Sequence, residues 1–105
     1  MFWLLGVGFA LAELPPPDYR DAVLDSVEAQ ADAMIQAGDL EGALRMVQGF
    51  RTQVASDARL AYEEGLIHRL LGDLPQAERC YREAVEQGPK LFFAWYDLGE
   101  LLLQN

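Results

Sequence analysis

The chain has 105 residues, which suits one small domain, and 51% of them are hydrophobic, which favours a globular fold over a disordered one. Its 17 acidic and 8 basic side chains give a formal net charge of −9. This charge argues against nucleic acid as a partner and against a polybasic contact with a membrane, because both depend on lysine and arginine. A single cysteine excludes an internal disulfide and any metal site built from several thiolates.

The first twelve residues form an apolar leader without a charged side chain. This leader is shorter than the ~17–25 residues that span a bilayer. Ala10 and Ala12 form a small-x-small pattern of the kind that precedes a signal-peptide cleavage site. We therefore expect a protein exported by a bacterium-like cell, for example to the periplasm, with Phe2–Ala12 as the segment that associates with the membrane or the export machinery. Two alternatives stay open: a cytoplasmic protein, and a protein anchored in the membrane by its N-terminus.

Residues 13–18 form a proline-rich spacer, because the three prolines at 15–17 fix the backbone and remove three N–H donors. Asp18 follows and can accept hydrogen bonds from the first free N–H groups of a helix. The helical domain is therefore predicted to cover residues 19–105.

An internal repeat organises this domain. The motif Gly-Asp-Leu at 38–40 recurs at 72–74, 34 positions later, and the same offset relates Gly65 to Gly99. A fixed period of this length indicates stacked helical repeats. Each glycine can end a helix in the left-handed conformation, and the aspartate after it can cap the next helix. We therefore predict turns at 38–39 and 72–73.

Between these turns, apolar residues recur at the spacing of helices, and no segment has the pattern of a strand. Helices are predicted before Gly38, from Leu40, after Asp57, from Leu74 and beyond Pro89. Three small residues are expected where helices approach closely: Gly65, Ala77 and Gly99. Two large aromatic residues, Tyr81 and Trp95, are expected to fill the space between the layers.

This arrangement resembles the tetratricopeptide repeat family, whose pattern is W-x2-L-G-x2-Y, then A-x3-F, then P, over 34 residues. Residues 58–91 match it with Gly65, His68, Ala77, Tyr81, Ala84 and Pro89. Residues 92–105 match its first half with Trp95, Leu98, Gly99 and Leu102, and residues 24–57 form a degenerate first repeat. The resemblance implies an all-α fold, a right-handed α-solenoid of antiparallel helix pairs with about two and a half repeats.

The residues offer no catalytic site, cofactor site or metal site by their spacing. His68 and Cys80 are predicted to pack in the core, because His68 takes a core position of the repeat and Cys80 adjoins a core tyrosine. Glu63 and Glu64 are adjacent, so they point in different directions, and we expect them on a solvated face. No set of nucleophile, base and orienting group is visible. The protein is therefore predicted not to be an enzyme and to need no cofactor.

The resemblance also implies a function: a non-catalytic interaction module or scaffold that binds a peptide or helix of a protein partner in a concave groove lined by the first helix of each pair. The corresponding positions of the first repeat are acidic: Asp25, Glu28 and Asp32. Those of the later repeats are the predicted peptide-binding residues: Arg59, Tyr62, Leu66, Arg69, Phe93, Tyr96 and Glu100. Because two guanidinium groups can fork onto carboxylates, we expect a peptide with both apolar and acidic groups.

The last predicted helix, Leu91–Leu103, is apolar at ten of its thirteen positions, more than one neighbouring helix can cover. Three covers are considered: a further helix downstream, a second copy of the chain, and the leader Phe2–Leu11 folding back. The alternative function is therefore a small structural subunit whose last helix is completed by self-association through Leu91–Leu103 or by a larger complex.

Overall fold

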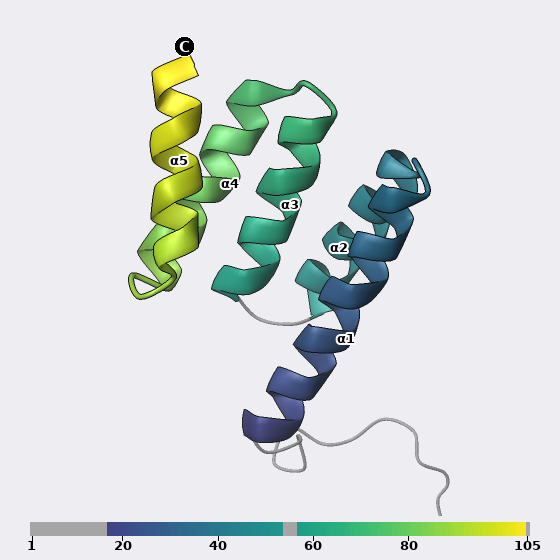
Figure 1. Cartoon of the computed structure of the whole chain (residues 1–105). Coiled ribbons are helices and arrows are strands. Elements are labelled where there is room, and N and C mark those ends of the chain that lie inside the picture. Colours follow the sequence, from purple (N-terminus) through teal and green to yellow (C-terminus); the bar gives the residue numbers. More distant parts are fainter. Residues whose placement is uncertain (1–16, 54–56, 105) are drawn as a thin grey trace, which may run out of the picture.

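The computed structural model describes residues 17–53 and 57–104, and these residues form an all-α fold (Figure 1). Within those ranges the chain has five helices and no strand. They are α1 (Pro17–Gln36), α2 (Leu40–Gln53), α3 (Ala58–Leu70), α4 (Leu74–Gln87) and α5 (Phe92–Gln104). The predicted all-helical fold is therefore confirmed.

The two glycine–aspartate turns form as the sequence predicts. Gly38 and Gly72 both adopt the left-handed conformation, with φ of 86° and 87°, which glycine tolerates because it has no Cβ. The carboxylate of Asp39 accepts a hydrogen bond from the backbone N–H of Gly42 at 2.9 Å. The carboxylate of Asp73 caps the start of α4 in the same way. The sharp turns therefore set successive helices side by side.

The helices follow one another across the molecule, with α1 and α2 on one side, α3 and α4 in the middle and α5 at the other side (Figure 1). Each helix packs against the next one in the chain, and α1 also contacts α3. The helix α5 packs chiefly on α4. The first helices of the pairs, α1, α3 and α5, are the elements on which the predicted binding residues lie.

The N-terminal side differs in detail from the prediction. The helix α1 begins at Pro17, one residue before Asp18, and its 20 residues exceed the 13 of α3 and of α5. The first repeat, predicted at 24–57, therefore begins inside a longer helix. The predicted leader, 1–12, and most of the spacer lie outside the described residues. No described helix is both long enough and apolar enough to span a membrane.

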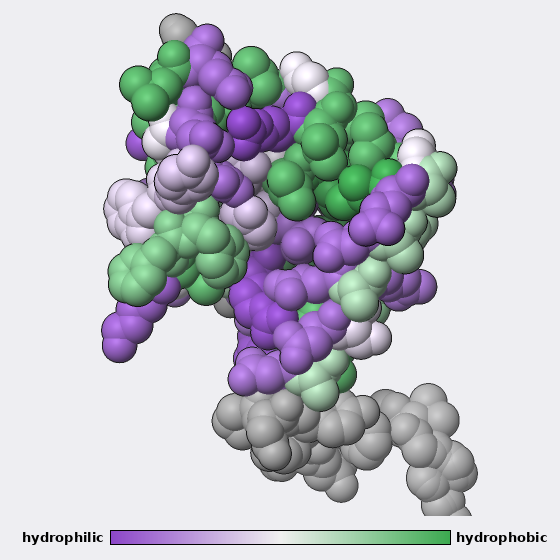
Figure 2. Space-filling model, in the orientation of Figure 1, coloured by the Kyte–Doolittle hydropathy of each residue, from purple (hydrophilic) through white to green (hydrophobic). Residues whose placement is uncertain are grey.

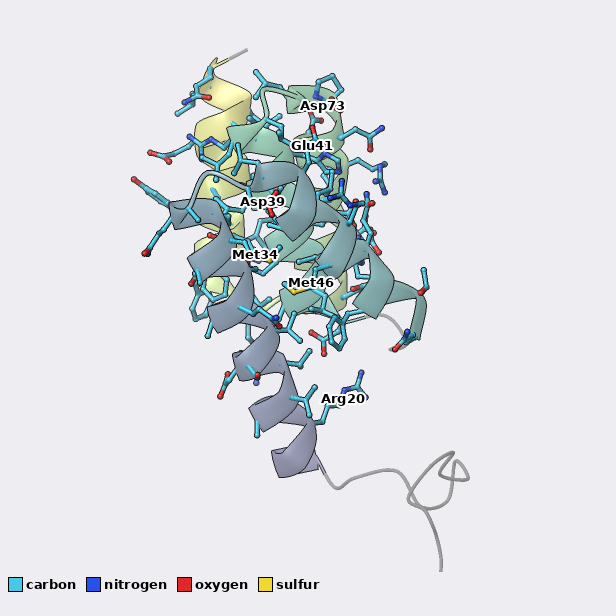
Figure 3. The ribbon with its side chains drawn as sticks, turned by 90° about the vertical axis from the view of Figure 1, so that its right-hand side faces the viewer. Arg20, Met34, Asp39, Glu41, Met46 and Asp73 are labelled. Carbon is cyan, nitrogen blue, oxygen red and sulfur yellow. The ribbon has the colours of Figure 1, made fainter. Side chains whose placement is uncertain are left out.

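The core runs along the helix pairs in three clusters. Met34 and Met46 lie between α1 and α2 (Figure 3), where they pack beside buried residues such as Val47. Between α3 and α4, Tyr81 is fully buried. Its ring lies 2.7 Å from the position that a Cβ on Gly65 would occupy. The expected close approach of α3 and α4 at this glycine is therefore confirmed.

Three expectations about packing are wrong: those for Trp95, for Gly99, and for the pair Glu63 and Glu64. Trp95 does not fill an interlayer space, because half of it (50%) is exposed, and a Cβ on Gly99 would meet no atom within 4 Å. Glu63 and Glu64 are not solvated, because each is only 5% exposed. These differences have one cause. Helix α3 has neighbours that cover several of its faces, whereas α5 packs mainly against α4.

Candidate functional site

Tyr62 joins α3 to α5 through its ring and its hydroxyl. Its ring stacks on Tyr81, with centroids 5.7 Å apart, and meets Phe93 edge-on at 4.7 Å. Its hydroxyl donates a hydrogen bond to the carboxylate of Asp97. Burial, and after it this hydrogen bond, raises the pKa of Tyr62 well above its ordinary value. The half-buried ring of Tyr62 is therefore held in place and supports the more exposed ring of Phe93 by packing against it.

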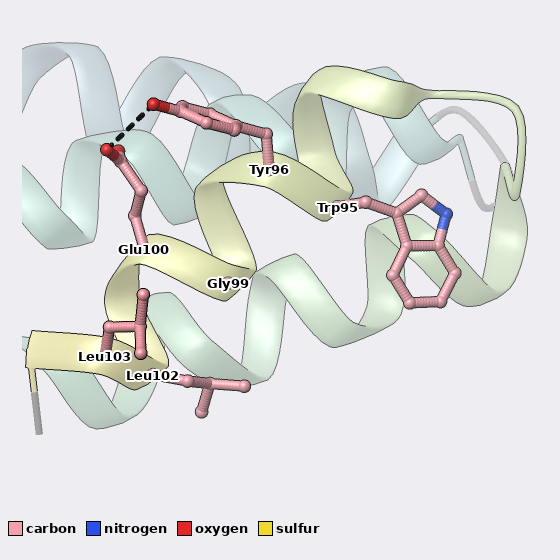
Figure 4. Close-up of a pocket in the computed structure, with 6 residues that line it drawn as sticks. All are labelled: Trp95, Tyr96, Gly99, Glu100, Leu102 and Leu103. Atoms are coloured by element: carbon pink, nitrogen blue, oxygen red, sulfur yellow. Dashed lines mark hydrogen bonds between the residues drawn. The ribbon is translucent and has the colours of Figure 1, made fainter.

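Arg69, Tyr96 and Glu100 form a polar group beside these rings. The hydroxyl of Tyr96 donates to Glu100 Oε2 at 3.1 Å (Figure 4). Arg69 Nη2 lies 3.8 Å from Glu100 Oε1. Tyr96 is 66% exposed and Phe93 is 49% exposed. We call Tyr62, Arg69, Phe93, Tyr96 and Glu100 the aromatic face. Five of the seven predicted binding residues are thus brought together where α3 meets α5.

Arg59 lies apart from the aromatic face, at the first turn of α3. Its guanidinium binds Glu28 through two hydrogen bonds of 2.9 Å and also pairs with Asp25, both on α1. The hydrogen bond with Glu28 is the main reason that the pKa of Arg59 is raised. The structure therefore places Arg59 as a link between α1 and α3, with its charge already paired. The sequence had suggested instead that this guanidinium faces a ligand carboxylate.

Leu66 and Asp32, the remaining predicted positions, differ in exposure. Leu66 lies on α3, four residues after Tyr62, and is half-buried, whereas Asp32 is exposed on α1. In the view of Figure 2, green and pale side chains mix with hydrophilic ones over α5, a second hydrophobic patch lies between the upper parts of α3 and α1, and hydrophilic side chains fill the lower middle of the molecule. Exposed aromatic rings thus lie on α5, whereas α1 exposes the carboxylates of Asp25 and Asp32.

Asp97 is a site residue that the sequence analysis missed. A signal for it was present, because Tyr62-Glu63 recurs 34 positions later as Tyr96-Asp97. This pairing puts a carboxylate on α5 at the repeat position of a carboxylate on α3. It does not say that the hydroxyl of one repeat bonds the carboxylate of the next, which depends on how the two helices are placed.

A second polar group lies inside the molecule around Glu64. The carboxylate accepts hydrogen bonds from Arg51 at 2.7 Å and from Gln48 at 3.2 Å, and His68 Nε2 lies 3.1 Å from it. Burial alone would raise the pKa of Glu64, but these hydrogen bonds outweigh it and hold the pKa below its ordinary value. Glu64 is therefore an ionised centre that ties α2 to α3.

The ligand atoms of Glu64, His68 and Cys80 lie within 4.8 Å of one another, so the fold gathers three donors that looked scattered in the sequence. Their surroundings do not suit a cation. Arg51 binds the Glu64 carboxylate, and Arg79 lies 3.8 Å from that carboxylate and 3.6 Å from the sulfur of Cys80. Burial raises the pKa of the Cys80 thiol to about 11, so the thiolate that metals prefer is disfavoured. The group is best described as a structural polar network.

Comparison with known proteins identifies the helix pairs. A family model described as Tetratricopeptide repeat matches residues 28–92 and, in a second alignment, residues 71–105. The chain belongs to the tetratricopeptide repeat family. A search of curated proteins found no match.

The tetratricopeptide repeats correspond to the helices in a simple way. Helices α1 and α2 form one pair, α3 and α4 form the next, and α5 takes the place of the first helix of a third. Tetratricopeptide repeats are generally protein–protein interaction modules. The aromatic face lies on α3 and α5, which are both first helices of their pairs.

Proposed function

We propose that this chain is a non-catalytic interaction module that binds a peptide or helix of a protein partner over the aromatic face. The observation that carries the proposal is the exposure of Phe93 and Tyr96 beside a half-buried Tyr62. Aromatic side chains in such settings supply much of the binding energy at interfaces, because they bury a large area and lose little conformational entropy.

The charges around the aromatic face set the chemistry of the peptide. Arg59 is paired with carboxylates of α1, and Arg69 lies near Glu100, so neither guanidinium favours an acidic ligand. Asp25 and Asp32 are exposed on α1. We therefore propose a peptide with apolar side chains on Phe93 and Tyr96 and basic side chains toward α1, and we drop the expected preference for acidic groups.

A peptide selection tests this proposal. Twelve-residue random peptides displayed on phage are selected against the full chain, and the binders are measured again with the variants Phe93→Ala and Tyr96→Ala. Each variant should weaken binding by about 1–3 kcal/mol, or roughly 5- to 150-fold. Leu70→Ala is the matched control, because Leu70 is as exposed as Phe93, at 49%, and lies outside the face.

Three results would count against the proposal. They are peptides that bind both aromatic variants as tightly as wild type, peptides that Leu70→Ala weakens equally, and selected peptides rich in acidic residues. Thermal unfolding of each variant, measured in parallel, separates loss of the face from loss of the fold.

A further inference from the structure

Helix α5 carries a second surface, which adjoins the aromatic face at Tyr96 and Glu100. We call Trp95, Gly99, Leu102 and Leu103 the end face (Figure 4). Trp95 is 50% exposed, Leu102 42% and Leu103 89%. The residues border a shallow, mainly apolar hollow of about 510 Å³, with Tyr96 and Glu100 at its edge. Among the described residues, no helix packs over this hollow.

The end face has a buried counterpart in the preceding repeat. Thirty-four positions earlier stand Ala61, Gly65, His68 and Arg69. Ala61 is fully buried and packs with Tyr81 of α4, and the ring of Tyr81 also lies against Gly65. His68 is 7% exposed. In α3, therefore, the positions equivalent to most of the end face are covered by a helix.

Among residues 17–53 and 57–104, nothing packs on Gly99 closely enough to require a glycine. A glycine within a helix costs about 0.5–1 kcal/mol relative to alanine. At Gly65 this cost is offset, because α4 comes too close for a Cβ. At Gly99 a Cβ would meet nothing within 4 Å. A glycine at this position, between an exposed tryptophan and exposed leucines, suits a helix that approaches α5 as α4 approaches α3.

We propose that the end face docks an amphipathic helix of a partner protein, packed on α5 as α4 packs on α3 and carrying basic side chains along its edges. The apolar stripe of that helix covers Leu102 and Leu103. A small or flat side chain lies over Gly99.

Charge favours such a partner over a second copy of this chain. Glu100 stands at the edge of the hollow, and α5 has no basic residue in its last turn, so no cation of α5 itself offsets the partial negative charge at its C-terminal end. The exposed rings of Trp95 and Tyr96 offer faces that attract lysine and arginine. Two copies, each with a net charge of −9, repel one another.

The test uses a helix whose packing the structure already shows. The probe is a fluorescent peptide with the sequence of residues 73–88, which contains α4, carrying Glu78→Lys, Glu83→Lys and Glu86→Lys. The peptide with the unchanged sequence, which keeps the three glutamates, is the control and is called the acidic twin below. Anisotropy with the full chain, in reducing buffer, should show binding of the basic peptide and at least tenfold weaker binding of the acidic twin. Equal affinity for both peptides, or no binding of the basic peptide, overturns the proposal.

A pair of glycine variants locates the site. Gly99→Gln fills the hollow without a clash inside the chain, so the melting temperature should not fall while affinity for the basic peptide drops at least tenfold. Gly49→Gln is the matched control, because Gly49 is also a helical glycine with nothing within 4 Å of a Cβ; Gly49 is exposed and Gly99 half-buried. It should leave binding unchanged. Unchanged binding by Gly99→Gln overturns the proposal. So does a dimer, seen by sedimentation, that Gly99→Gln dissociates.

Discussion

Glu63 is the buried acid whose environment stabilises its neutral form. It is 5% exposed, and its Oε2 has no hydrogen-bond partner among the described residues. Burial, followed by the charges of Asp32 and Glu28, raises its pKa from the ordinary 4.5 to about 7, while Arg59 opposes the shift. Near neutral pH, a proton therefore binds this side chain more tightly in the folded chain than in the unfolded one.

The sign of the resulting pH dependence follows from linkage. Because the folded-state pKa is the higher one, the stabilising contribution of Glu63 is complete below pH 4.5 and is lost as pH rises through about 7. We expect Glu63→Gln to remove this loss. Between pH 5 and 8, the free energy of unfolding of wild type should fall by about 1–3 kcal/mol more than that of the variant. Urea denaturation at both pH values measures it, and parallel pH profiles would contradict the assignment.

Two glycines at equivalent repeat positions should respond in opposite ways to alanine. Gly65→Ala places a methyl group 2.7 Å from the ring of Tyr81, and we expect a loss of about 1–3 kcal/mol in the free energy of unfolding. Gly99→Ala meets no atom and should gain about 0.5–1 kcal/mol from helix propensity. Urea denaturation of both variants checks the pair. A loss of similar size in both would mean that the two helices pack alike.

At the scale of the elements, α2, α3 and α4 are joined by ionic contacts as well as by apolar packing. Arg51 on α2 reaches both Glu64 on α3 and Glu83 on α4. The side chains of Arg51 and Glu64 are only 17% and 6% exposed, so solvent screens their attraction weakly. Removal of the cation alone leaves a buried carboxylate that has lost its closest partner.

Arg51→Met should therefore destabilise the fold by about 2–4 kcal/mol. The double variant Arg51→Met with Glu64→Gln should lose less than the two single variants added together, with a coupling of about 1–3 kcal/mol, because it leaves no unpaired charge. Chemical denaturation of the four proteins closes the cycle. If the losses in free energy of unfolding simply add, the other hydrogen-bond partners of Glu64 compensate its charge when Arg51 is absent.

The sequence predicted the turns better than the surfaces, for a physical reason. A glycine with positive φ and a capping aspartate act over three or four residues. Their recurrence after 34 positions was therefore enough to predict both turns. Whether a helical face is covered depends on a neighbour that local pattern does not place. Ala61 and Trp95 hold the same repeat position, yet only Ala61 lies beneath a following helix.

In the candidate site, too, the sequence predicted which residues share a helical face but not which residues meet between helices. Spacing placed Phe93 and Tyr96 on one face of their helix, because residues three or four apart share a helical face. The contact of Tyr62 on α3 with Phe93 on α5 follows instead from how the two helices are placed. Spacing also put Arg59, Asp25 and Glu28 on first helices, but it did not pair them. Their mutual ion pairs follow from the distance between α1 and α3, which only the fold defines.

At the scale of the whole molecule, the helices form a row in which most contacts are between neighbours. Stability in such arrays is approximately a sum over adjacent interfaces. Helices α3 and α4 have partners on both sides, whereas α5 packs chiefly on α4. Opening of the array should therefore begin at an end and leave the middle pair intact.

Hydrogen exchange followed by mass spectrometry should resolve this gradient. We expect the slowest exchange in α3 and α4 and markedly faster exchange in α5, by roughly tenfold or more, because end elements open with a lower free energy than the core. Protection of α5 equal to that of α3 would contradict the expectation. It would indicate that the outer side of α5 is covered in solution.

The reactivity of the Cys80 thiol can report how often the interface between α3 and α4 opens. Cys80 is the single cysteine of the chain, it is fully buried, and its neighbour across the interface is Gly65 of α3. An alkylating reagent can therefore reach the sulfur only after α4 has separated from α3. The rate of alkylation of the intact protein, measured at several reagent concentrations, therefore reports how often α4 separates from α3. No labelling site has to be engineered into the chain. Repeating the measurement with a bound partner would show how far ligand binding is transmitted to the central pair.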